Sequence, residues 1–215
     1  VVKATGDNQN PSSIYNSYTG VQWACENGAN VVSMSYGSEN SSNAMQDLIY
    51  AYPEVVFIAA AGNDSSSTQN YPAAYQNVIG VGSVDSNDLR SSFSNYNVGF
   101  PWIDIAAPGG YSYGGLLSTV YTESLNGYAR FGGTSMATPF AAGLVGLMLS
   151  VNPSLTPIQI QNCLVNSGVE INQSIGPRID AYQALLCAQP ENENPIPAFT
   201  ASPQVTFENQ SVTFS

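Results

Sequence analysis

The chain has 215 residues, of which 9% are charged, and its 15 acidic and 4 basic residues give a formal net charge of -11. This length suits one domain with a sizeable core. An acidic surface repels phosphate backbones, which disfavours nucleic-acid binding, and no apolar run reaches the roughly 20 residues of a membrane span, so we expect none.

Apolar runs and helical patterns alternate along the chain. Near-continuous apolar runs are typical of strands buried in a parallel sheet, whereas apolar residues at helical spacing predict helices. The first half of the chain predicts a strand at 1–4, a helix at 13–27, a strand at 31–35, a helix at 43–52, and strands at 55–60 and 78–84. Short strands and loops are expected at 91–128. Three helices follow, at 135–150, 157–166 and 180–187. This order predicts an α/β fold with a parallel sheet and helices on both faces.

The segment 131–169 contains no charged residue. Within it, the helix predicted at 135–150 is apolar on every side, so we expect it to be buried at the centre of the core. Ser135 stands at its N-terminus behind two glycines, where free backbone N–H groups and the helix dipole can stabilise an oxyanion. Serine is also a common N-cap, so position alone leaves both roles open.

Several motifs carry a resemblance to a known family. Residues 133–139 (GTSMATP) resemble the nucleophile motif of the subtilisin-like serine proteases, the subtilases. Residues 31–37 (VVSMSYG) resemble the substrate-binding strand of that family, and residues 59–64 (AAAGND) resemble its oxyanion-hole segment. The segments YPAAY, VIGVG and AAPG follow in the family's order. The resemblance covers residues 1–187 and implies a subtilisin-like fold.

The resemblance also implies roles for individual residues. Ser135 would be the nucleophile and Asn63 an oxyanion donor, although an asparagine after a glycine is also an ordinary turn residue. An extended peptide would pair with the end of the strand predicted at 31–35. The residues implied in substrate binding are Ser35, Tyr36, Gly37, Ala60, Ala61 and Gly62. The pocket walls at 60–62 and 71–73, with Asp64 at the rim, predict room for a large apolar or a basic side chain. For Ser35, Tyr36 and Gly37, a plain strand end is the alternative.

The sequence contains no histidine. Subtilases use a histidine base oriented by an aspartate, and both precede the serine in the chain. The resemblance therefore implies that this is the C-terminal part of a catalytic domain, with the aspartate and histidine upstream of Val1. The predicted function is a serine endopeptidase whose isolated chain is inactive.

Two alternatives come from other functional classes. One is a non-catalytic pseudo-protease that binds extended peptides along the retained cleft. The other is an α/β-hydrolase esterase, which is weaker because the motif has Ala137 where the hydrolase elbow has glycine.

The implied chemistry needs no cofactor. Asp104 lies where some relatives hold a cation, so a structural calcium is one alternative and a solvated carboxylate the other. Cys163 and Cys187 flank the last two predicted helices and are expected to form a disulfide in a secreted protein. Cys25 is expected to be a buried free thiol, although a disulfide partner in the missing upstream segment is the alternative.

The composition changes at Ala188. Residues 188–195 predict a linker after the catalytic part at 1–187, and residues 196–215 resemble the first strands of a PKD-type β-sandwich module, common behind secreted enzymes. Abundant Asn, Ser and Tyr with little Lys also favour an extracellular protein that acts on protein or peptide substrates.

Overall fold

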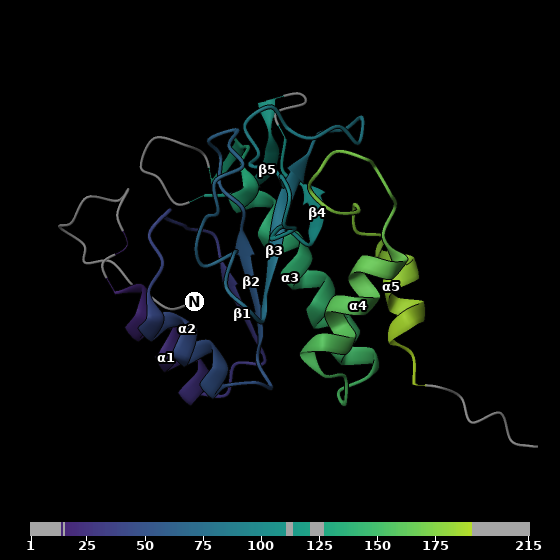
Figure 1. Ribbon diagram of the computed structural model, residues 1–215. Coiled ribbons are helices and arrows are strands. Elements are labelled where there is room, and N and C mark those ends of the chain that lie inside the picture. The colour runs from purple at the N-terminus through teal and green to yellow at the C-terminus, as the bar shows by residue number, and fades with distance from the viewer. Residues whose placement is uncertain (1–13, 15, 111–113, 121–126, 191–215) are drawn as a thin grey trace, which may run out of the picture.

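The computed structural model describes residues 14, 16–110, 114–120 and 127–190 (Figure 1). Four parallel strands form its central sheet, in the spatial order β1–β2–β3–β4. The strands are β1 (Val31–Met34), β2 (Val56–Ala60), β3 (Val78–Val84) and β4 (Ile105–Pro108). Every residue of β2 and β3 is buried, as expected for parallel strands covered on both faces.

Helices cover both faces of the sheet (Figure 1). The helices of one layer are α1 (Ser17–Glu26) and α2 (Asn43–Ala51), and those of the other are α3 (Thr134–Val151), α4 (Pro157–Ser167) and α5 (Ala181–Ala188). Along β2, Phe57 and Ala59 belong to the core under α1 and α2, whereas Val56 and Ile58 belong to the core under α3. The predicted α/β fold is confirmed.

The helix starts follow local capping chemistry. Ser42, Thr156 and Asp180 are the N-caps of α2, α4 and α5, and the side chain of each accepts a backbone N–H three residues further on. The helix expected from residue 13 begins at Ser17, and its N-cap Asn16 makes no such side-chain bond. A two-stranded antiparallel hairpin, β5 (Leu116–Thr119) and β6 (Tyr128–Phe131), leads directly into α3.

The prediction of α3 as the central helix is confirmed by its packing against all four strands, and one of its faces is exposed. Seven of its residues are buried, but Phe140, Leu147 and Val151 are 50%, 54% and 41% exposed. Among the described residues, α3 is the one helix long and apolar enough for a membrane span by length and composition. It packs against all four strands, and a core helix packed in this way can meet the same criteria.

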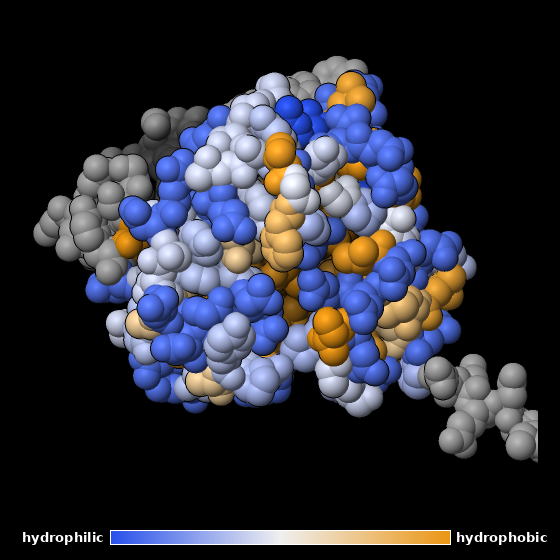
Figure 2. Space-filling model, viewed as in Figure 1, coloured by the Kyte–Doolittle hydropathy of each residue, from blue (hydrophilic) through white to orange (hydrophobic). Residues whose placement is uncertain are grey.

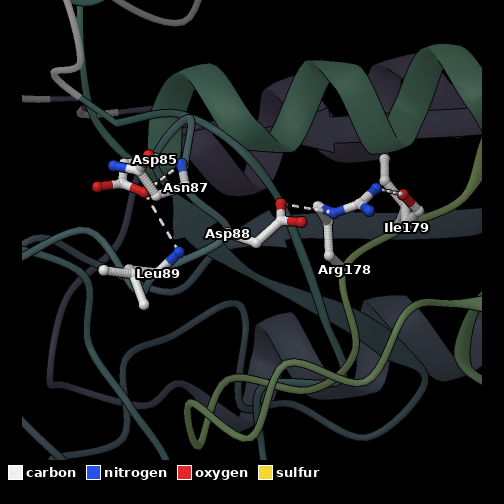
Figure 3. Close-up of polar contacts among 6 residues, drawn as sticks. All are labelled: Asp85, Asn87, Asp88, Leu89, Arg178 and Ile179. Atoms are coloured by element: carbon white, nitrogen blue, oxygen red, sulfur yellow. Dashed lines mark hydrogen bonds and ion pairs between the residues drawn. The ribbon is translucent and has the colours of Figure 1, made fainter.

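The two edges of the sheet differ. At β4, Ala106 donates to Pro177 O at 2.8 Å and accepts from Ile179 N at 2.9 Å, so the segment after α4 covers that edge. Arg178 in this segment forms an ion pair with Asp88 at 2.7 Å, which ties it to the loop after β3 (Figure 3). Within the described part of the chain, β1 has no strand on its outer edge.

The disulfide prediction is confirmed. Cys163 in α4 is bonded to Cys187 in α5, with 5.7 Å between their Cα atoms, and Cys25 is a buried free thiol. The bond fastens the last helix of the domain to α4. On the face in Figure 2, hydrophilic side chains predominate, and apolar ones gather along the strip between the two helix layers.

The strand predicted at 1–4 and the PKD-like strands predicted at 196–215 lie outside the described residues. Of the linker predicted at 188–195, the structure describes only 188–190, which follow or end α5. The proposed division into a catalytic part, a linker and a further module stays a prediction.

Candidate active site

A cavity of about 810 Å³ opens where β1 and β2 end and α3 begins. In a parallel sheet the carboxyl ends of the strands meet at one edge, where α/β proteins bind their ligands. Three chain segments far apart in the sequence line this cavity together, namely 35–40 after β1, Ala60 with 62–64 at and after the end of β2, and Thr134 with Ser135 at the start of α3.

Ser135 is the second residue of α3 and is half-buried. Its backbone N–H belongs to the first turn of the helix, where N–H groups lack partners within the helix and the dipole is positive. The N-cap of α3 is Gly133, which supplies no side-chain cap. The hydroxyl of Ser135 does not cap the helix either, since it donates to a carbonyl outside α3, and Ser135 lines the cavity.

Ser35 and Ser135 exchange two hydrogen bonds. The Ser135 hydroxyl donates to the carbonyl of Ser35 at 3.1 Å, and the Ser35 hydroxyl donates to the carbonyl of Ser135 at 2.9 Å. A backbone carbonyl cannot take the proton, so this arrangement holds the Ser135 hydroxyl without activating it. The pair also fastens the end of β1 to the first turn of α3.

Asn63 lies in the turn after β2, with its amide fixed from one side. Its Oδ1 accepts the backbone N–H of Thr134 at 2.8 Å and the Thr134 hydroxyl at 3.0 Å. The Nδ2 has no acceptor among the described residues and is the free donor. Both predicted residues, Asn63 and Ser135, thus line one cavity, as an oxyanion-binding arrangement requires.

Glycines set the turn before α3 against the sheet. The N–H of Gly133 donates to Gly109 O at 2.8 Å. A Cβ on Gly109 would lie 2.6 Å from both Gly133 O and the Ser83 hydroxyl. Gly109 therefore allows the close backbone approach that positions the turn, and because it directly follows β4 it links the start of α3 to the sheet.

The residues predicted to bind substrate fall into two groups. Ser35, Tyr36, Gly37, Ala60 and Gly62 line the cavity. Ala61 does not line the cavity but is fully buried behind it, where its carbonyl accepts the side-chain amides of Asn70 and Asn95 at 3.3 Å and 2.9 Å.

Tyr36 forms part of the cavity wall. Burial raises the pKa of its hydroxyl to about 12, so the phenol stays neutral near pH 7. This hydroxyl also has no hydrogen-bond partner among the described residues. The cavity thus presents a neutral aromatic wall next to Ser135.

Two asparagines of the site escaped the sequence analysis. Asn70 lines the cavity and is buried between Gly37 and Gly62. Asn95 is buried, and its Oδ1 accepts the backbone N–H groups of Asp64 and Ser66 at 3.0 Å and 3.1 Å. Each acts on a segment distant in the sequence, so no local pattern marks it. The sole local signal is that Asn70 directly precedes the YPAAY motif.

The surroundings of Asp104 do not fit a cation. One carboxylate oxygen accepts the N–H of Gly80 at 2.7 Å and the other accepts the Gln161 amide at 2.9 Å, so donors and not further oxygens face it. Burial raises the pKa of Asp104 to about 6, against the lowering effect of these two hydrogen bonds. No group of three or more metal-ligating side chains occurs in the described ranges. Asp104 is a partly buried carboxylate, each oxygen of which accepts a hydrogen bond.

Comparisons of the sequence with known proteins point to one family. The profile of the Subtilase family (Peptidase_S8) matches residues 1–193. Alkaline elastase YaB of Bacillus sp. (strain YaB) is 40% identical over 157 residues, 72% of this chain and 39% of the relative. Thermitase of Thermoactinomyces vulgaris is 40% identical over 171 residues, 77% of this chain and 57% of the relative. The chain thus spans about half the length of these relatives.

Solved structures of proteases share the fold of this chain. A protease of Pseudoalteromonas arctica PAMC 21717 superimposes with a TM-score of 0.73 at 30% identity, covering 80% of this chain and 58% of the other. The self-cleaved protease domain of PatA gives a TM-score of 0.74 at 24% identity, covering 87% of this chain and 72% of the other, which shows the shared fold. The family profile covers all the described elements, so this chain belongs to the subtilase family of peptidases.

Proposed function

We propose that this chain carries the nucleophile, the oxyanion site and much of the substrate cleft of a secreted serine endopeptidase. The observation that carries the proposal is the joint placement of Ser135 and Asn63 in one cavity. A serine hydroxyl at a helix N-terminus faces the same cavity as a carboxamide whose acceptor end is already occupied by Thr134.

In the proposed reaction, Ser135 Oγ attacks the carbonyl carbon of the scissile peptide bond. The carbonyl oxygen becomes an oxyanion, which Asn63 Nδ2 and the backbone N–H of Ser135 stabilise. The amine leaves with a proton, and water then hydrolyses the acyl-enzyme. A base must accept the hydroxyl proton first. Since these 215 residues contain no histidine, the proposal assigns the base and its aspartate to the parent protein upstream of Val1.

The substrate would be a protein or peptide in extended conformation. The exposed backbone of Ser35 and Gly37 follows β1 directly beside Ser135, so a peptide can add to this segment as a strand. Hydroxyl, amide and backbone groups supply the chemistry, so the proposal includes no cofactor. The disulfide between Cys163 and Cys187 supports an extracellular location, since such bonds persist in oxidising compartments.

A second candidate is a pseudo-protease that binds extended peptides without cutting them. The reciprocal hydrogen bonds between Ser35 and Ser135 favour it, because they show the hydroxyl engaged by a backbone carbonyl and not by a base. This candidate uses the same cleft and differs only in chemistry.

Two proteins and one substitution separate the candidates. This chain and its upstream-extended parent are treated with a fluorophosphonate probe and a chromogenic peptide, each with a Ser135→Ala control. The peptidase hypothesis expects labelling and turnover in the parent alone, both abolished by Ser135→Ala. Turnover by this chain alone would contradict the assignment of the base. A folded parent that binds the peptide but neither labels nor turns over would establish the pseudo-protease.

A further inference from the structure

A buried carboxamide lies behind the turn that carries Asn63. It belongs to Asn95, which lies between β3 and β4 in the chain and is only 2% exposed. Its Nδ2 donates to Ala61 O at 2.9 Å, and its Oδ1 accepts the backbone N–H groups of Asp64 and Ser66 at 3.0 Å and 3.1 Å. One side chain therefore binds the backbone both before and after Asn63.

The backbone around Asn95 is paired with the same turn. The N–H of Asn95 donates to Gly62 O at 3.1 Å, and the N–H of Ser65 donates to Phe93 O at 2.8 Å. The contact is also close, because a Cβ on Gly62 would lie 2.5 Å from the Nδ2 of Asn95. The segment 93–95 thus holds the turn with main-chain bonds, and the Asn95 side chain fills the space between these bonds.

The conformation of the turn depends on this side chain. Ser65 has a φ of 47°, in the left-handed region that a serine adopts only at a cost. This conformation directs the N–H groups of Asp64 and Ser66 toward one point, a backbone nest that binds an electronegative atom. The Oδ1 of Asn95 lies at that point, so its two hydrogen bonds offset the cost at Ser65.

Asn95 does not line the active-site cavity. It can influence a substrate there only through the turn, whose residue Asn63 does line the cavity. Asn63 is fixed at two points, since Thr134 binds its side-chain Oδ1 and Asn95 binds the backbone on both sides of it. The first contact sets which end of the Asn63 amide can donate, and the second sets where that donor lies.

We propose that Asn95 is a positioning residue for the oxyanion donor Asn63. The inference rests on the proposed function and adds to it a residue that the substrate does not touch. Without the Asn95 carboxamide, Ala61 O and the N–H groups of Asp64 and Ser66 lose their partner, and the turn relaxes. The Nδ2 of Asn63 then lies away from the place where the oxyanion forms. The transition state loses stabilisation, while binding of the uncleaved peptide changes little.

The test is a double-mutant cycle in the parent protein, with one chromogenic peptide as substrate. Asn95→Ala should lower kcat by about 10- to 100-fold, because a misplacement of about 1 Å costs up to this factor, and should leave KM within a few-fold. In the Asn63→Ala background, the same substitution should lower kcat by less than about 3-fold, since the two residues act as one unit. A purely structural role would lower kcat by the same factor in both backgrounds.

Asn97 provides a matched control. Its side chain makes the same set of bonds, because it donates to Ile103 O at 2.9 Å and accepts the N–H groups of Trp102 and Ile103 at 3.0 Å each. None of these three residues lines the active-site cavity. Asn97→Ala should lower the urea midpoint of unfolding, as Asn95→Ala does, but should leave kcat unchanged. An equal fall in kcat for both variants would show that lost stability causes the effect, and would overturn the proposal.

The remaining outcomes separate this proposal from the proposed function. If the parent fails to react with the fluorophosphonate probe, the peptidase function fails, and the role of Asn95 fails with it. If the parent reacts, but Asn95→Ala leaves kcat unchanged, raises KM at constant kcat, or lowers kcat equally with and without the Asn63 amide, only the role of Asn95 fails.

A second variant covers the case in which Asn95→Ala does not fold. The carboxylate of Asn95→Asp still accepts the two N–H groups but, when ionised, cannot donate to Ala61 O. Its kcat should fall while Asn63 is present, and this fall should disappear in the Asn63→Ala background. A fall of the same size in both backgrounds would overturn the proposal.

Discussion

The carboxamide oxygen of Asn63 accepts two hydrogen bonds from Thr134, one from the backbone N–H at 2.8 Å and one from the hydroxyl at 3.0 Å. The hydroxyl of Thr134 in turn accepts the N–H of Gly62 at 3.2 Å. This chain of bonds joins the turn after β2 to the first turn of α3. It fixes which end of the Asn63 amide can donate into the cavity, before any substrate arrives.

The first prediction concerns this donor. Replacing Asn63 by Ala in the parent protein should lower kcat by about 10²–10³-fold, the loss found when the corresponding kind of donor is removed from a subtilisin. KM should change little, because the amide acts on the charge that develops during the reaction. Steady-state kinetics on one chromogenic peptide measures both. A large rise in KM at constant kcat would instead assign Asn63 to substrate binding.

Thr134→Val offers a graded comparison. Valine keeps the shape but removes the hydroxyl, while the backbone N–H still holds Asn63. The loss in kcat should therefore be smaller than for Asn63→Ala. A loss as large in Thr134→Val would show that the orientation of the amide depends on the hydroxyl alone.

The sequence predicted the parts of this site that rest on local pattern. The apolar run before Gly62 predicted β2, and the uncharged segment after Gly133 predicted α3. That Asn63 and Ser135 share one site was implied only by the resemblance to the subtilases. The buried position of Asn70 could not be predicted, because it depends on the approach of two glycines that follow different strands.

Other differences have similar causes. The helix α3 is apolar on every side, and composition does not tell which side lacks a covering element; the structure leaves Phe140 and Leu147 exposed. Asp104 is a carboxylate in a loop-like stretch, and only the fold shows that it turns inward to Gly80 and Gln161.

A second prediction concerns the packing of the turn at Gly133, before α3, against Gly109. Gly109→Ala should lower the free energy of unfolding by about 1–3 kcal/mol, because the added methyl group would press on Gly133 O and Ser83. Gly143→Ala is the matched control, since nothing lies within 4 Å of the added Cβ on the exposed side of α3. It should raise stability by up to about 1 kcal/mol through helix propensity. Urea unfolding of both variants measures the difference, and equal effects would show that the contact at Gly109 relaxes freely.

A third prediction concerns the disulfide between α4 and α5. The sequence separation of its cysteines is 24 residues, so replacing Cys163 and Cys187 together by Ala should lower the free energy of unfolding by about 3 kcal/mol on the chain-entropy model. In the unreduced, denatured chain a thiol reagent should titrate Cys25 alone. Titration of three thiols without reductant would show that the bond does not form.

The last prediction is a pH dependence of stability that originates at Asp104. Burial raises the pKa of this carboxyl from 3.8 to about 6, and the N–H of Gly80 and the Gln161 amide only partly oppose this. The folded state therefore holds the proton more tightly than the unfolded state. The stabilising contribution is fully present below about pH 4 and is lost as the pH rises through about 6.

Asp104→Asn, which cannot ionise, should remove this dependence. Relative to the variant, the wild-type chain should lose about 1–3 kcal/mol of unfolding free energy between pH 4 and pH 8, the amount that a shift of this size allows. Denaturant unfolding across this range measures the difference, and Asp47→Asn, which neutralises an exposed carboxyl on α2, corrects for the change in net charge. If the difference in unfolding free energy between wild type and Asp104→Asn does not change with pH, the two hydrogen bonds offset the effect of burial on the pKa of Asp104. A difference of opposite sign would mean that they outweigh it, and that Asp104 is a stabilising carboxylate at neutral pH.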